Sequence, residues 1–316
     1  MKVAVLKGGR SLERNVSLRS GARVEDALQK LGHEVVPVDV GPDLVDQLQT
    51  VKPDVAFVAL HGRGGEDGTV QELLELVGVP YTASGPSACS RCMDKVVSKN
   101  ELRSAGLPTP DFYAFSQAAF EELGAGRALP ALEERLDFPI VVKPAAQGSA
   151  LGIKFARTAA DVPAAIVAAF SYDTKVLLER HVAGRDLAVS VLDGPDGPEA
   201  LPVVEAIPHE DDFYDFEARY EIGRTAFVCP ALIPPETTAR AQELALAAYA
   251  TLGCSGFARI DLMLEQDTGD LYLLEANAIP GLTDTSLLPL AAEAAGISFE
   301  ALIARIVELA VTRTPA

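Results

Sequence analysis

The chain has 316 residues, 48% of them apolar, and a formal net charge of −18. This length is sufficient for two or three domains around a large core. The negative charge argues against nucleic acid and anionic membrane surfaces as partners, but a few clustered cations could still bind a small anion. No apolar run approaches a membrane span, and the N-terminal apolar stretch is too short for a signal peptide. We therefore expect a cytoplasmic protein.

The cysteines support this compartment only weakly. Cys89 and Cys92 have the CxxC spacing of metal or redox sites, and Cys229 and Cys254 stand alone. No second CxxC and no His pair completes a zinc site. Buried reduced thiols are the favoured interpretation.

Residues 1–92 alternate strand and helix patterns. This alternation predicts a Rossmann-like parallel sheet, whose ligands bind beyond the carboxyl ends of the strands. Strands are expected at 3–6, 33–40, 54–60 and 79–84, and helices at 14–32, after residue 40 and at 69–78. The candidate ligand loops are therefore 7–13 and 61–68.

The sequences of these two loops do not by themselves identify a function. The first has glycines where a dinucleotide-binding motif would begin but lacks GxGxxG. Glu13 is by itself more often a favourable acid in a first helical turn than a catalytic group. The second loop, HGRGGEDG, would permit close backbone approach to a ligand, although a plain polar turn is equally expected.

Residues 93–182 begin a second unit, in which Lys95 lies on a helix stopped by Gly106 and Pro108. A hairpin follows, with strands at 138–144 and 152–157. Lys143 lies in its first, strongly apolar strand and needs an anion; with no acid nearby in sequence, a phosphate is a candidate. The loop from Gly148 to Gly152 could close its N–H groups over phosphates, or be an ordinary flexible loop.

Residues 183–316 form the last unit, after a strand at 175–179. Asp186 starts the next strand, and the acidic, aromatic segment 209–227 is typical of a lid or a disordered insertion. Helices are expected at 236–254, 287–296 and 298–310. Residues 284–286 cap the second of these, whose N-terminus could bind a carboxylate.

The stretch 256–286 reads as two apolar strands joined by a three-residue loop, 267–269, with Gly269 at positive φ. This register places Asp261 opposite Glu275 and Arg259 opposite Asn277, all on one face. At about 4 Å and an effective dielectric near 20, two carboxylates repel by roughly 4 kcal/mol.

Protonation, salt bridges or a divalent cation could relieve this repulsion. The ligand set of two carboxylates and an amide suits Mg²⁺ bound together with phosphates. An exposed hairpin with scattered acids is the alternative, but the flanking apolar residues favour a metal site.

Taken together in order, these motifs resemble the D-alanine–D-alanine ligase family of the ATP-grasp superfamily, over essentially the whole chain. The motifs are GGRSLERNVSL, LHGRGGEDGTVQELLE, MDK, PIVVKPAAQGSALGI, VLLER, FYDFEARY and GFARIDLML…LLEANAIPGLT…SL. The resemblance implies an α/β fold with an N-terminal Rossmann-like domain at 1–92. It also implies two ATP-grasp subdomains, at 93–182 and 183–316, that hold ATP between them.

The implied activity is ATP-dependent joining of two D-alanines through an acyl phosphate, for peptidoglycan precursors, by a cytoplasmic homodimer. The residues that resemble ATP contacts are Lys95, Lys143, Gly148, Ser149, Gly152, Glu179, Val182, Asp186 and Arg219. Those that resemble ligands of two Mg²⁺ or Mn²⁺ ions are Asp261, Glu275 and Asn277.

The resemblance also implies contacts to the amino acids. Glu13 and His61 resemble residues that orient the first D-alanine, and Ser286 and Leu287 those that bind the carboxylate of the second. Glu66 resembles a further substrate-binding residue. Arg259 and the Gly281 N–H resemble oxyanion donors. The trio that latches the lid would be Glu13, Ser149 and Tyr220.

Several positions depart from the family pattern and bear on specificity, namely Asn15, Ala150, Arg219 and Ala278-Ile279. The alternatives are a ligase for D-serine or L-amino acids, or a non-catalytic nucleotide-binding protein. The intact FYDFEARY argues against D-lactate, and the missing GxGxxG argues against a nicotinamide-dependent oxidoreductase.

Overall fold

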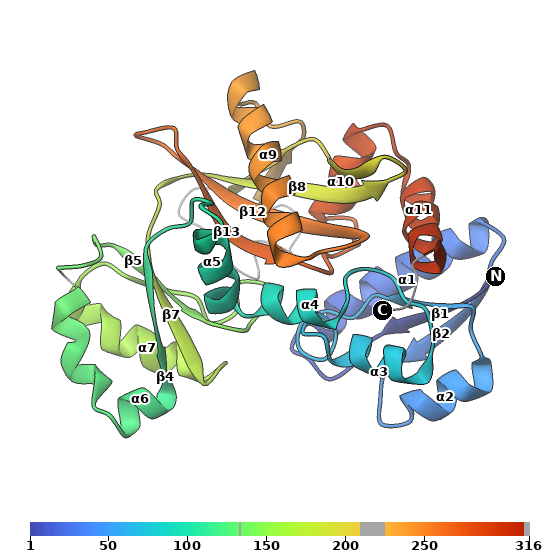
Figure 1. Cartoon of the computed structure of the whole chain (residues 1–316), viewed down its shortest axis with the longest axis horizontal. Coiled ribbons are helices and arrows are strands. Elements are labelled where there is room, and N and C mark those ends of the chain that lie inside the picture. Colours follow the sequence, from blue (N-terminus) through green and yellow to red (C-terminus); the bar gives the residue numbers. More distant parts are fainter. Residues whose placement is uncertain (133, 209–224, 313–316) are drawn as a thin grey trace.

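The structure is a computed structural model that describes residues 1–132, 134–208 and 225–312. Three sheets lie along an elongated molecule, and Figure 1 shows the N-terminal sheet at one end and the central sheet at the other. Within the described ranges, no helix is long and apolar enough to cross a membrane.

The first sheet is parallel, as predicted, in the order β2-β1-β3. Its strands are β1 (Lys2–Lys7), β2 (Glu34–Asp39) and β3 (Val55–Val58). The strand predicted at 79–84 is reduced to one parallel bridge between Ala56 and Tyr81. The helices of this part are α1 (Arg14–Lys30), α2 (Leu44–Val51), α3 (Thr69–Val77) and α4 (Pro86–Met93), the last of which was not predicted.

The second sheet is antiparallel, in the order β4-β7-β5-β6. It comprises β4 (Phe112–Ser116), β5 (Ile140–Pro144), β6 (Lys154–Ala156) and β7 (Lys175–Arg180). Its helical elements are α5 (Lys95–Ser104), which precedes it, α6 (Gln117–Glu121), η1 (Ala125–Leu132), η2 (Ala159–Asp161) and α7 (Val162–Phe170). The predicted hairpin of β5 and β6 is confirmed, and α7 covers β5 with a hydrophobic core of its own.

The third sheet is antiparallel, in the order β11-β10-β8-β12-β13, with β9 beside β8. Its strands are β8 (Gly184–Gly194), β9 (Gly197–Ala200), β10 (Val204–Pro208), β11 (Thr225–Val228), β12 (Phe257–Glu265) and β13 (Leu271–Asn277). The helices α9 (Pro235–Leu252), α10 (Leu287–Ala294) and α11 (Phe299–Thr312) confirm the three predicted ones.

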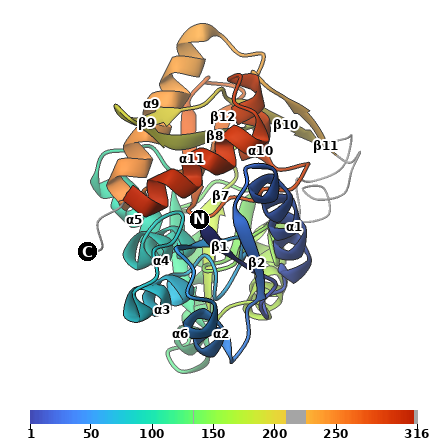
Figure 2. The same ribbon diagram turned by 90° about the vertical axis from the view of Figure 1, so that its right-hand side faces the viewer.

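The C-terminal helix joins the first and third parts of the chain. Figure 2 shows α11 running between the sheet that holds β8 and β12 and the region of α1 and β1. Buried side chains of both parts form one continuous hydrophobic core, whereas the central part has a separate one. Each sheet draws its strands from one predicted domain; the boundaries after residues 92 and 182 stay predictions.

The hairpin of β12 and β13 has the predicted pairs, Arg259 with Asn277 and Asp261 with Glu275. The predicted three-residue loop is wrong. The Glu265 amide bonds to the Asp270 carbonyl, so four residues form the turn, with Gly269 at φ +75° as expected. The longer turn alone would move the pairing by one residue. A register shift after Asp261 adds one residue to β13, and this extra residue restores the predicted pairs.

Candidate active site

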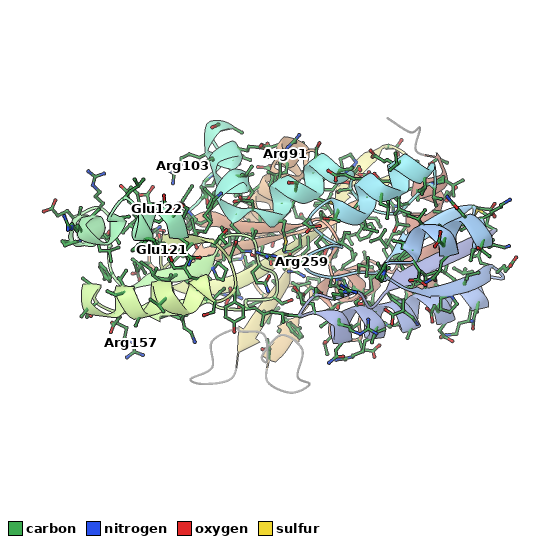
Figure 3. All side chains as sticks on the ribbon, turned by 90° about the horizontal axis from the view of Figure 1, so that it is seen from below. Arg91, Arg103, Glu121, Glu122, Arg157 and Arg259 are labelled. Atoms are coloured by element: carbon green, nitrogen blue, oxygen red, sulfur yellow. The ribbon has the colours of Figure 1, made fainter. Side chains whose placement is uncertain are left out.

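The floor of the site is one face of the β12–β13 hairpin. Arg259 Nε and Nη2 donate to the two carboxylate oxygens of Asp261 at 2.6 and 2.8 Å. The amide of Asn277 donates to the same carboxylate at 3.1 Å. Figure 3 shows Arg259 in the middle of the molecule, whereas Arg103 and Arg157 project from its surface. The guanidinium is therefore held in a fixed orientation within the interior.

The second acid of the hairpin has a cation from another part of the chain. Lys95, the first residue of α5, lies 3.1 Å from Glu275 Oε2, and its Nζ also donates to the Gln147 carbonyl at 2.7 Å. Asp261 and Glu275 thus each carry a salt bridge. Of the three ways to relieve their repulsion, this structure uses salt bridges.

Lys143 also has a protein partner, which corrects the expectation that no acid is near it. Pairing of β5 with β7 places Glu179 opposite Val141, and Lys143 Nζ donates to Glu179 Oε1 at 2.6 Å. Lys99 forms an ion pair with the other oxygen of Glu179. Burial would raise the pKa of Glu179, but the two ammonium groups outweigh it and hold this pKa below its ordinary value. Burial lowers the pKa of Lys99 to about 8.

A pocket that is partly open to solvent lies between the second and third sheets. Its walls include many residues predicted to hold ATP or metal, namely Lys143, Glu179, Val182, Asp186, Asp261 and Glu275. The rest of the wall is largely apolar, with residues such as Val141, Ile153, Phe155, Met263 and Leu274. Largely apolar walls with a few polar groups are typical of pockets that bind small molecules.

The charges around this pocket are balanced. Arg259 pairs with Asp261, and Arg180 pairs with Glu265. The three remaining ammonium groups, those of Lys95, Lys99 and Lys143, are matched by the carboxylates of Glu179, Glu275 and Asp186. The fold thus gathers three lysines here in a chain whose formal net charge is −18.

The loop after β5 has an unusual backbone. Ser149 and Ala150 have φ of +54° and +57°, and Gly152 has φ of +77°. Two consecutive non-glycine residues in the left-handed region are costly and cluster at functional sites. Ser149 Oγ donates to Glu13 Oε2. A Cβ at Gly148 would collide with Glu13 Oε1, so a side chain at this position would displace the Glu13 carboxylate.

Glu13 belongs to a second polar group, formed by the ends of the first sheet. His61 Nδ1 lies 3.1 Å from Glu66 Oε1, and its Nε2 lies 3.0 Å from Ser20 Oγ. The same Ser20 hydroxyl accepts a hydrogen bond from the Leu282 amide at 3.2 Å. The arrangement is satisfied when Ser20 donates to Nε2 and a neutral imidazole donates from Nδ1 to Glu66.

Ser20 was not predicted as a site residue. Its replacement should lower both the stability of the fold and the affinity of the site. In Ser20→Ala the buried Leu282 N–H and His61 Nε2 lose their partner, so we expect unfolding free energy to fall by about 1–3 kcal/mol. For the activity that the resemblance implies, the KM for D-alanine should also rise. Urea unfolding and initial rates measure these effects. Ser104→Ala, at the exposed last residue of α5, is the control, and equal behaviour of the two variants would contradict the assigned bridge.

The chain between β13 and α10 forms the far side of the site. Ser286 is the N-cap of α10, as predicted, but its side chain makes no capping bond; Ser286 Oγ instead accepts from the Thr283 amide at 2.9 Å. Arg23 of α1 donates to the carbonyls of Leu282 and Thr283 at 3.1 and 3.0 Å and pairs with Asp284. The N-terminal part of the chain thus fixes this loop.

Gly281 has no room for a side chain, because a Cβ there would lie 2.7 Å from Ser286 Oγ. We expect Gly281→Ala to displace Ser286 and, for the activity that the resemblance implies, to raise the KM for the second amino acid about tenfold, equivalent to about 1.4 kcal/mol. Initial rates over a wide range of D-alanine concentration measure this. Gly126→Ala, with its nearest neighbour at 3.8 Å, is the control. An unchanged KM would contradict the assignment.

The predicted residues thus form two groups, the pocket between the second and third sheets and the cluster around Glu13 and His61. Ser149 joins the loop after β5 to this cluster, and Ser20 joins it to the loop before α10. Leu287 lines the pocket, although it was predicted to contact the second amino acid. Arg219 and Tyr220 lie outside the described residues. Ser20, Arg23 and Lys99 were not predicted from the sequence; only Lys99 had a signal, since it stands four residues after Lys95 on the same helical face.

The oxygen atoms of the hairpin fit a divalent cation by their chemistry. Asp261, Glu275 and Asn277 share one face beside the Lys95 and Lys143 cluster, and carboxylate and amide oxygens are the ligands that Mg²⁺ accepts. Among the described residues, no cluster of three His, Cys, Asp or Glu side chains could hold a metal. The hairpin offers two carboxylates and one amide oxygen. A Mg²⁺ ion bound by these three groups would keep further coordination positions for phosphate oxygens.

A parallel sheet followed by two antiparallel sheets around one pocket is the architecture of an ATP-grasp ligase. The models for the D-Ala–D-Ala ligase C-terminus and N-terminus match residues 102–308 and 43–84. The D-alanine–D-alanine ligase of Syntrophotalea carbinolica is 45% identical over 96% of this chain and 94% of its own. That of Desulforudis audaxviator is 44% identical over 99% of both chains. The chain belongs to the D-alanine–D-alanine ligase family.

Solved structures agree with this placement. The Bacillus anthracis D-alanine–D-alanine ligase complexed with ATP superposes with a TM-score of 0.82 at 32% identity, covering 98% of this chain and 97% of the other. The VanG D-Ala:D-Ser ligase of Enterococcus faecalis gives 0.81 at 28% identity, covering 98% of both chains. The fold is therefore shared by ligases that differ in their second amino acid.

Proposed function

We propose that this protein joins two D-alanines into D-alanyl-D-alanine with ATP, for peptidoglycan precursor synthesis in the cytoplasm. One observation carries the proposal. The paired acids Asp261 and Glu275 line one pocket together with Lys143 of β5, and Lys95 of α5 forms an ion pair with Glu275. A homodimer is proposed from the family resemblance alone.

The first step would be phosphoryl transfer from ATP to the carboxylate of the first D-alanine. The apolar walls beside Val182 would hold the base, Asp186 the ribose, and Lys95 and Lys143 the phosphates. Glu13 and His61 would orient the amino acid, so catalysis rests on positioning and charge neutralisation. Asp261, Glu275 and Asn277 would hold Mg²⁺ or Mn²⁺, which when bound supplies neutralisation of phosphate charge.

The second step would be attack by the amine of the second D-alanine on the acyl phosphate. A C–N bond forms, inorganic phosphate leaves with one oxygen of the first carboxylate, and the amine loses a proton. Arg259 and the Gly281 N–H would stabilise the tetrahedral oxyanion. The Asp261 carboxylate keeps the guanidinium of Arg259 oriented for this role. Ser286 would hold the carboxylate of the second amino acid.

ADP release by the pure protein tests this function. The protein with ATP and Mg²⁺ is offered D-alanine, L-alanine, D-serine and D-lactate, each alone and in pairs. We expect turnover with D-alanine alone. Turnover with L-alanine alone, or only with the pair of D-alanine and D-serine, would overturn the assigned specificity. No turnover with any combination would favour a non-catalytic nucleotide-binding protein.

A further inference from the structure

Lys99 is a buried lysine that the proposed reaction does not use. Its side chain is fully buried, and it does not line the nucleotide pocket. Its Nζ donates to Thr109 Oγ1 at 2.6 Å and lies 3.5 Å from the Leu273 carbonyl. Its third partner is the carboxylate of Glu179. Lys99 thus connects α5 to β7 and β13, the strands on both sides of the pocket.

Glu179 stands between two lysines with different surroundings. Its carboxylate is only 1% exposed, so it needs a cation at all times. On the pocket side it binds Lys143, and on the opposite side it binds Lys99. Lys143 is the lysine that could reach a bound phosphate. If it did so, Glu179 would keep a counter-ion only through Lys99.

We propose that Lys99 is a positioning residue of the nucleotide pocket, which neutralises and fixes Glu179 from the buried side and so frees Lys143 to bind a phosphate. The inference rests on the proposed nucleotide site. Without Lys99, Lys143 would be the remaining counter-ion of Glu179. It would then stay in its ion pair with the Glu179 carboxylate and would not bind the ligand. Lys99 would therefore act on ATP affinity without touching ATP.

A double-mutant cycle with Glu179 separates this role from a general structural one. Glutamine at position 179 has the shape of glutamate but needs no counter-ion. Affinity for Mg²⁺ with the non-hydrolysable analogue β,γ-imido-ATP is measured by calorimetry on the full chain. We expect Lys99→Met to weaken binding about tenfold in the natural background and less than about twofold in Glu179→Gln. Arg103→Met, exposed on the same helix, is the control and should change nothing.

The outcomes distinguish the inference from the site on which it rests. An equal loss from Lys99→Met in both backgrounds, or no loss in either, would overturn the positioning role. If Lys143→Met and Glu179→Gln also leave affinity unchanged, the nucleotide site itself is wrongly placed. Should Lys99→Met fail to fold, Lys99→Gln, which keeps a hydrogen-bond donor, is subject to the same expectations.

Discussion

Replacing Glu275 by glutamine is expected to lower turnover at least about a hundredfold while the protein stays folded. The change keeps the shape of the side chain but removes one of two carboxylates on the hairpin face. It would remove a metal ligand and the partner of Lys95 together. Steady-state ADP release at saturating substrates measures the loss, and thermal unfolding reports on the fold.

A matched control distinguishes the loss of a metal ligand at position 275 from the general effect of removing one negative charge. Glu293→Gln makes the same chemical change on an exposed position of α10 and should leave turnover unchanged. Titration with Mg²⁺ adds a second readout, because Glu275→Gln should need more metal for half-maximal activity. Near-normal activity at ordinary Mg²⁺ would mean that the metal site lies elsewhere.

Arg259→Lys is expected to lower kcat by about 10²–10³-fold. Lysine keeps the positive charge but loses the planar guanidinium that makes two hydrogen bonds to Asp261. The remaining donor would not be aimed at the developing oxyanion. Because the proposed role lies in the second step, the KM for ATP should change much less than kcat.

Single-turnover kinetics identify the step affected by Arg259→Lys. The acyl phosphate should still form, and its consumption by the second amino acid should slow. Arg240→Lys, exposed on α9 and paired with Glu243, is the control. Retention of more than about a tenth of the natural kcat would contradict the assigned role.

The local sequence patterns predicted the strongly periodic helices and strands. They also predicted which residues pair across the hairpin of β12 and β13. The parallel sheet follows from the alternation of strand and helix patterns, and the hairpin of β5 and β6 from two strand patterns around a Gly/Ser loop. The shared face of Asp261 and Glu275 follows from the alternation of side chains along strands. The predicted length of the β12–β13 turn was wrong. The predicted pairs are nevertheless present, because the register shift in β13 offsets the extra residue of the turn. Register errors of one residue would have turned the acids to the other face.

The partners of the buried charges could not be predicted from the sequence. Lys143 and Glu179 are 36 residues apart, and only strand pairing brings them together. Ser20 and Leu282 are 262 residues apart, joined where α1 meets the loop before α10. Such contacts depend on tertiary packing, to which neither periodicity nor local spacing is sensitive.

Transfer of an oxygen atom from substrate to phosphate tests the acyl-phosphate reaction most directly. The protein is supplied with ATP, Mg²⁺ and D-alanine labelled with ¹⁸O in its carboxylate, and the inorganic phosphate is analysed by mass spectrometry. Attack of the first carboxylate on ATP predicts one ¹⁸O atom in the phosphate for each dipeptide formed. Dipeptide formation with unlabelled phosphate would contradict the proposed chemistry at the β12–β13 hairpin.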